Sequence, residues 1–154
     1  MSSEAFEKVN MTLRLYEMRR EEGLRKARAW FVDEFRGVSA EEFMQKYPPG
    51  SKENAYFRQV VSFWDMCAGV ANRGLVDEEL FFENAGEAWL VLERVKGTLA
   101  QWRAAFKNPH ICHNLETFVG RMEAWQEKRA PGSSEARRQM IQMMEQARAK
   151  TAVS

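Results

Sequence analysis

The chain has 154 residues, of which 45% are hydrophobic and 29% are charged. This length corresponds to about one ordinary domain and is sufficient to bury a sizeable core. With 23 Lys and Arg against 22 Asp and Glu, the net charge of +1 argues against a dedicated polyanion-binding protein. The low content of 9 Gly and 4 Pro disfavours β-sandwiches, barrels and low-complexity chains.

The ends and the cysteines of the chain indicate a cytoplasmic protein. The N-terminal sequence lacks the pattern of a signal peptide, and no stretch approaches the roughly 18 consecutive apolar residues of a membrane helix. The two cysteines, Cys67 and Cys112, are too few for a disulfide-stapled secreted domain. We expect both to be small buried hydrophobic residues. Whether they lie close enough to form a disulfide stays open, because geometry decides it.

The first segment, residues 3–36, has two apolar stripes with helical spacing. One contains Phe6, Val9, Leu13 and Tyr16, and the second, from Leu24 to Phe35, has the same period. The pattern lapses near Gly23, so the segment predicts either two consecutive helices or one kinked helix.

The middle of the chain carries clear helix start and stop signals. Ser39 with Glu42 forms a capping-box pattern for a short helix, and Ser51 is the next candidate N-cap after Pro48, Pro49 and Gly50. The segment 52–73 then has an apolar arc that covers roughly 220° of a helix. A helix with so narrow a polar face must be surrounded by others, so we expect residues 57–70 to form the central helix of the domain.

The second half of the chain continues the helical pattern. Gly74 is expected to end the central helix, and Asp77 is a candidate N-cap for a short helix to about Asn84. Two longer helices follow, at about 86–108 and 111–128, with apolar residues spaced alternately by four and three. An alternation of four and three is typical of helices that pack nearly antiparallel. Trp89 lies just off the apolar stripe of its helix, so it is the tryptophan for which we expect surface exposure.

The last segment resembles a hinge followed by an amphipathic helix. Residues 130–134 are rich in Pro, Gly and Ser, and residues 135–150 place Ala136, Met140, Met143, Met144 and Ala147 on one face. We therefore divide the chain into a helical bundle domain, 1–129, and a hinge with a C-terminal helix, 130–154. This helix either docks on its own domain or packs against a second copy or another protein, because methionine is common at interaction surfaces.

Taken together, these elements predict an all-α fold: an antiparallel bundle of five or six helices around a central buried helix, plus the C-terminal helix. Three segments, 25–31, 63–83 and 114–118, together with Trp102, resemble an uncharacterised bacterial family of helical domains of unknown function. The resemblance covers roughly residues 10–127. It supports the fold and implies no activity. Members of such families often carry a leading membrane helix, which we do not expect here.

Few residues suggest chemistry. His110, Cys112 and His113 place three potential metal ligands within four residues, but a zinc site usually needs a second group of ligands elsewhere. The favoured interpretation is a loop and helix start, with His113 in solvent and Cys112 packed. Asp65 falls at the edge of the polar arc of its helix, where a solvated or hydrogen-bonded carboxylate is the usual case. We therefore expect no metal, no cofactor and no catalytic residue.

The sequence thus favours a non-enzymatic cytosolic interaction or regulatory module, with Met140, Met143 and Met144 as the interaction residues. The partner is either a second copy, which would make a homodimer, or another protein. The alternative is a small-molecule-binding or enzymatic helical bundle with a buried polar site near Asp65 or at residues 110–113. Nucleic acid is not an expected partner, since residues 1–36 mix eight basic with seven acidic side chains.

Overall fold

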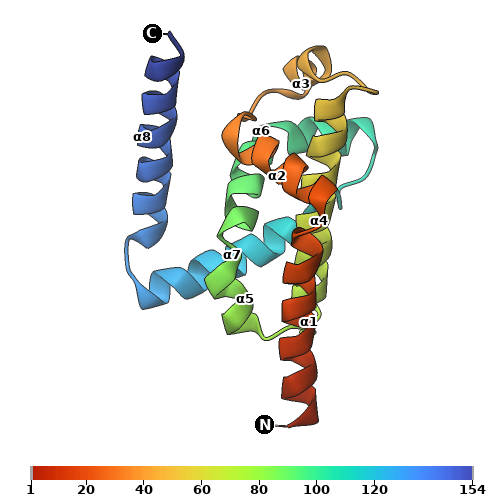
Figure 1. Ribbon diagram of the computed structural model, residues 1–154, viewed down its shortest axis with the longest axis vertical. Helices are drawn as coiled ribbons and strands as arrows, with labels where there is room; N and C mark the ends of the chain where they lie inside the picture. The colour runs from red at the N-terminus through yellow and green to blue at the C-terminus, as the bar shows by residue number, and fades with distance from the viewer. Residues whose placement is uncertain (1, 154) are drawn as a thin grey trace. The chain divides into compact units, whose positions relative to one another are not determined.

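The computed structural model describes residues 2–153, and the regular structure in this range is entirely α-helical (Figure 1). This confirms the predicted all-α class. The helices in this range are α1 Ser3–Arg19, α2 Glu22–Asp33, α3 Ala40–Lys46, α4 Lys52–Asn72, α5 Glu78–Asn84, α6 Gly86–Ala105, α7 His113–Arg129 and α8 Ser133–Val153. They form two compact units, one up to Val119 and one from Gly120 onward. The predicted division of the chain into domains at residue 130 stays a prediction.

The N-terminal segment forms two helices rather than one kinked helix. The Glu21 carboxylate accepts the backbone N–H groups of Gly23 and Leu24, each at 2.9 Å. It thereby caps α2, because the first N–H groups of a helix have no partner within the helix. The break is therefore created by a capping side chain, and Gly23 lies in the first turn of α2.

The buried face of α1 differs from the predicted stripe. Phe6 and Leu13 are 59% and 54% exposed, whereas Thr12 and Leu15 are buried. The Thr12 hydroxyl donates to the Lys8 carbonyl at 2.9 Å and accepts the Asp77 N–H at 3.2 Å. The turn before α5 therefore packs against the Thr12 side of α1. The apolar spacing alone could not reveal this partner, which lies 65 residues away.

The predicted start and stop signals are confirmed in the first unit. The side-chain oxygens of Ser39, Ser51 and Asp77 each accept the N–H of the third residue after them, at 3.1, 3.2 and 2.9 Å. Gly74, just after α4, has a φ of 73°, the left-handed conformation that glycine adopts without steric cost. These local signals fix where α3, α4 and α5 begin and where α4 ends.

Helix α4 is buried along most of its length. Helix α2 packs against it (Figure 1). Val60 is fully buried and Trp64 is 2% exposed. Aromatic rings fill the space beside α4. The ring of Phe57 lies 4.5 Å from that of Phe43 in α3 and 5.5 Å from that of Trp102 in α6, centroid to centroid. Such ring contacts add to the stabilisation from apolar burial.

The expectation that Trp89 is exposed is wrong. Its side chain is only 2% exposed, because the first half of α6 buries residues on several sides, including Ala88 and Val91. Further along α6, the buried Arg94 donates to the carbonyl groups of Phe31 and Val32 in α2. Arg94 thus satisfies carbonyl groups in the last turn of α2, which ends at Asp33.

Candidate functional site

The predicted interaction residues of α8 lie on the surface. Met140, Met143 and Met144 are 56%, 61% and 55% exposed, and no residue of Ser133–Val153 is buried. At about 100° per residue, these side chains share one face of the helix with Ala136 and Ala147. We call these five residues the methionine face. It is an apolar surface on which three adaptable side chains stand in solvent.

The side of α8 opposite the methionine face makes polar contacts within the second unit. The Arg138 guanidinium donates to the Glu123 carboxylate of α7 at 2.8 Å. The loop before α8 is held by the N–H of Gly132, which donates to the Glu127 carboxylate at 2.6 Å. Gly132 has a φ of 87°, as the tight turn between α7 and α8 requires. Neither of these side-chain contacts involves a residue of the methionine face.

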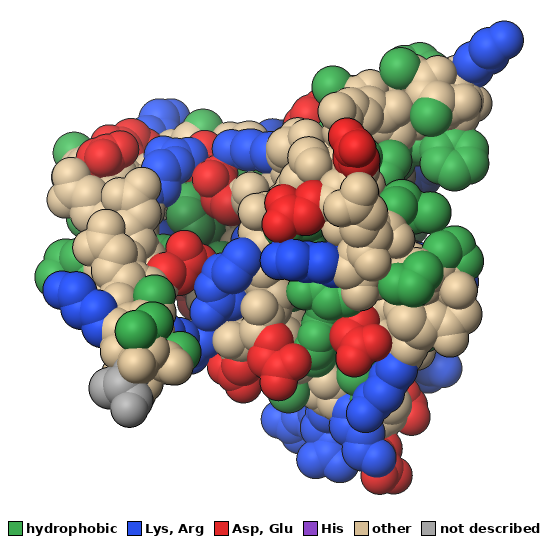
Figure 2. All heavy atoms as spheres, turned by 90° about the horizontal axis from the view of Figure 1, so that it is seen from above, with side chains coloured by type: hydrophobic (Ala, Val, Ile, Leu, Met, Phe, Trp, Pro, Cys, Tyr) green, Lys and Arg blue, Asp and Glu red, His purple; other side chains and the backbone are tan. Residues whose placement is uncertain are grey.

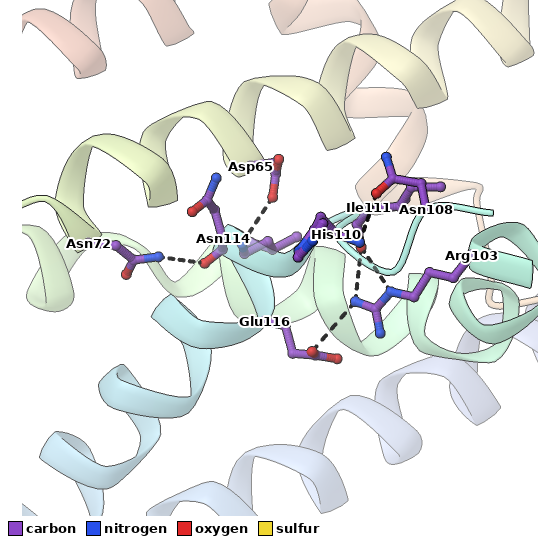
Figure 3. Close-up of polar contacts among 9 residues, drawn as sticks. Asp65, Asn72, Arg103, Asn108, His110, Ile111, Asn114 and Glu116 are labelled. Carbon is purple, nitrogen blue, oxygen red and sulfur yellow. Dashed lines mark hydrogen bonds and ion pairs between the residues drawn. The ribbon is translucent and has the colours of Figure 1, made fainter. Parts of the chain in front are cut away.

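The residues of the loop between α6 and α7 do not converge on one point. The rings of His110 and His113 are exposed and 6.0 Å apart, whereas the Cys112 side chain is buried. Within residues 2–153, no group of three or more His, Cys, Asp or Glu side chains could hold a metal ion. The loop is instead held by Arg103, whose guanidinium donates to the Ile111 carbonyl at 2.9 and 3.1 Å (Figure 3).

Asp65 has a structural role in this region (Figure 3). Its carboxylate, on α4, accepts the N–H of Leu115 in the first turn of α7 at 3.0 Å. About two turns further along α4, the Asn72 amide donates to the Asn114 carbonyl at 3.0 Å. A carboxylate at a helix N-terminus satisfies unpaired N–H groups and opposes the helix dipole. Asp65 on α4 therefore caps α7, although Asp65 and Leu115 are 50 residues apart in the sequence.

A partly buried polar cluster in the first unit was missed by sequence reasoning. The Arg28 guanidinium donates two hydrogen bonds to the Glu87 carboxylate, each at 2.8 Å, and the Trp64 indole N–H donates to the same carboxylate at 2.9 Å. The three side chains come from α2, α6 and α4. No spacing signal in the sequence relates Glu87 to Arg28, which is 59 residues away.

Tyr16 lies near this cluster, and its hydroxyl has no hydrogen-bond partner among residues 2–153. Burial raises the pKa of Tyr16 to about 12. The positive charge of Arg19 lowers this pKa and the negative charge of Glu87 raises it, both by less than burial does. The Arg19 guanidinium also lies 4.7 Å from the centre of the Tyr16 ring. A neutral phenol in this setting is a packed aromatic side chain rather than a proton donor at neutral pH.

Both cysteines are free and buried, so the disulfide that the sequence left open is not formed. Burial raises the pKa of Cys67 to about 12. Burial, assisted by the Asp65 carboxylate, raises the pKa of Cys112 to about 11. Reactive cysteines need the opposite shift, because the thiolate is the nucleophile. The two thiols are therefore held in their protonated, unreactive form.

Among the surface hollows of the first unit are two open ones of about 570 and 390 Å³. The larger lies between α1 and the turn after α4, with Met11 and Leu75 in its wall, and the smaller lies between α2 and the start of α4. None of the predicted site residues lines either hollow. On the face shown in Figure 2, basic and acidic side chains are interspersed. No helix within residues 2–153 is long and apolar enough to cross a membrane.

Comparison with known proteins supports the resemblance drawn from the sequence. A family model described as Domain of unknown function (DUF4760) matches residues 5–122. No curated protein and no solved structure matches the chain. The match ends before α8, so the methionine face lies outside the shared region.

Proposed function

The chain belongs to the DUF4760 family, whose function is unknown, and we propose that it is a non-enzymatic protein-interaction module that contacts its partner through the methionine face of α8. A homodimer is one form that such contact can take. A cytosolic location is part of the proposal and fits the two free thiols, which persist in a reducing compartment.

One observation carries the proposal. Three methionines within two turns of α8 are each more than half exposed, in a 21-residue helix without a buried residue. Most helical stability in proteins comes from packing of an apolar face rather than from helix propensity. Exposed, clustered methionines are typical of surfaces that adapt to a partner. The methionine face is thus suited to being covered by another molecule.

The first unit serves as the scaffold in this proposal. We describe it as an antiparallel bundle of five or six helices around α4. The burial of α4, its packing against α2 and α6, and the aromatic contacts beside it support this arrangement. A closely packed bundle of this kind supplies a rigid scaffold.

The alternative, an enzymatic or ligand-binding bundle, has less support. Asp65 is engaged as a helix cap, and His110 and His113 are exposed whereas Cys112 is buried. The polar cluster around Glu87 is formed by hydrogen bonds from Arg28 and Trp64 to the same carboxylate. None of these groups faces a hollow described above.

Site-specific photo-crosslinking tests the proposal. A photoreactive residue is placed singly at Met140, Met143 or Met144 in the full chain, in cells that produce the protein. The matched control is Gln142, an uncharged α8 residue whose side chain points about 140° away from the centre of the methionine face. We expect discrete protein adducts from the three methionine positions and few from the control.

Two results would contradict the proposal. Adducts that form equally well from position 142 would show contact without a preferred face. The absence of adducts from all three methionine positions would show that no protein covers this surface.

A further inference from the structure

We propose that the partner of the methionine face is an amphipathic helix whose apolar stripe is bordered by Asp and Glu side chains. This inference rests on the proposed function and names the chemistry of the partner. It is carried by a second feature of α8, the placement of its charged residues around the methionine face.

The charged residues that border the methionine face are all basic. At about 100° per residue, Lys150 lies on one side of the face, and Arg137 and Arg148 lie on the other side, all within about 100° of its centre. The two acidic residues of α8, Glu135 and Glu145, point more than about 110° away from that centre. An apolar stripe between two basic borders is complementary to an apolar stripe between acidic borders.

The centre of the face is free of charge. Residues 139–144 contain no acidic or basic side chain, so the three methionines can be covered without burying an ion. Lys150 has no ion-pair partner among residues 2–153, whereas Arg137 and Arg148 also interact within the chain. A helix that lies in such a surface is a common mode of peptide recognition.

The same charges disfavour a second copy of the chain. If two α8 helices paired antiparallel around Met143, Arg137 of one would lie opposite Arg148 of the other. A parallel pair would place Arg148 beside Lys150. Like charges in these positions oppose association, so both arrangements are less favourable than an acidic partner.

Two synthetic peptides of about 20 residues test the inference against the full chain. Both form an amphipathic helix with the same leucine stripe, bordered by Glu in one peptide and by Lys in the other. We expect the Glu-bordered peptide to bind about tenfold more tightly by fluorescence anisotropy, with affinity that falls as salt is added. Replacing the three methionines by Gln should abolish binding of both peptides.

Charge reversal is the decisive control. The variant R137E/R148E/K150E should bind the Lys-bordered peptide more tightly than the Glu-bordered one. The single substitution Lys150→Glu should reduce the difference in affinity between the two peptides. Circular dichroism of each variant confirms that α8 is still helical. Met44→Gln replaces a methionine of α3 that is 49% exposed, and it should leave the affinity for both peptides unchanged.

Several outcomes would overturn the inference. Equal binding of the two peptides would indicate apolar contact without charge recognition, and no binding of either would exclude this class of partner. Concentration-dependent self-association that requires the methionine face would identify a second copy. Binding of the same face to phosphatidylserine vesicles, but not to the peptides, would identify a membrane. The crosslinking result at residues 140–144 can hold in the first three cases, so failure here is distinguishable from failure of the proposed function.

Discussion

At the scale of single residues, the Glu87 carboxylate joins three helices. It accepts two hydrogen bonds from Arg28 in α2 and one from Trp64 in α4, and it is itself part of α6. The side chains of Arg28 and Glu87 are 21% and 13% exposed, so this ion pair is shielded from solvent more than those on the surface. Charge-assisted hydrogen bonds with two parallel donors are strong and geometrically specific.

We expect Glu87→Gln to lower the free energy of unfolding by about 2 kcal/mol, because it leaves the Arg28 charge partly buried without its partner. Urea denaturation at pH 7 measures the change. The control is Glu22→Gln, which breaks the exposed ion pair with Lys26 and should cost no more than about 0.5 kcal/mol. Equal effects of the two substitutions would show that the Glu87 cluster is no more than a surface pair.

Tyr16→Phe should raise the free energy of unfolding at pH 7 by about 1 kcal/mol, because it removes a buried hydroxyl that has no partner among residues 2–153. It should also weaken the alkaline loss of stability. Burial raises the pKa of Tyr16 from 10.0 to about 12, so above pH 10 the unfolded chain loses the phenolic proton while the folded chain keeps it. The free energy of unfolding is therefore unaffected by this titration below pH 10 and falls as the pH rises from 10 towards 12.

Urea titrations between pH 9 and 11 measure this second effect. Stability of the native chain should fall over this range, since the pKa of Cys67 is also raised, from 9.0 to about 12. In the Tyr16→Phe variant the fall should be shallower. A variant that is less stable than the native chain at pH 7 would show that the hydroxyl makes a stabilising contact.

At the scale of elements, the helix starts divide into those set locally and those set from a distance. The caps at Ser39, Ser51 and Asp77 were predictable, because the capping oxygen and its N–H donor are three residues apart. The cap of α7 was not, because the Asp65 carboxylate and the Leu115 N–H meet only when α4 and α7 are folded. The stripe predicted for α1 is wrong at Phe6 and Leu13 for the same reason, because apolar spacing does not reveal that Thr12 contacts the distant turn at Asp77.

Asp65→Ala should therefore destabilise the first unit by about 1 kcal/mol, as the loss of a helix cap does. Asp65→Asn keeps an acceptor oxygen and should cost only a few tenths of a kcal/mol, the share due to charge and helix dipole. Amide hydrogen exchange should be faster in the first turn of α7 in the Ala variant only. If the two variants exchange alike, the carboxylate does not cap this helix.

At the scale of the whole molecule, the all-α fold class could be predicted from the helical periods of the sequence. The candidate site could be predicted only in part. The methionines of α8 were found because they repeat at helical spacing, and their exposure agrees with a surface role. The polar cluster at Glu87 combines residues from three distant segments, so no window of sequence contains it. Patterns report which side of a helix is apolar, but not which neighbour covers it.

Removing residues 131–154 should leave the melting temperature of the remaining chain within about 2 °C of the native value, because α8 has no buried residue. Calorimetry of the full and shortened chains measures the difference. Sedimentation of both chains provides a second readout. A melting temperature lower by more than about 4 °C with an unchanged oligomeric state would mean that α8 stabilises its own molecule, contrary to the proposed function.

The path of α7 has a consequence for how the last part of the chain becomes ordered. One uninterrupted helix begins at His113 in the first unit and continues to Arg129 in the second. Starting a helix is unfavourable, whereas lengthening an existing one adds a hydrogen bond for each residue fixed. The turn that Asp65 holds can thus act as a template from which residues 120–129 wind without a nucleus of their own. A carboxylate in α4 thereby influences the helicity of the segment that leads to α8.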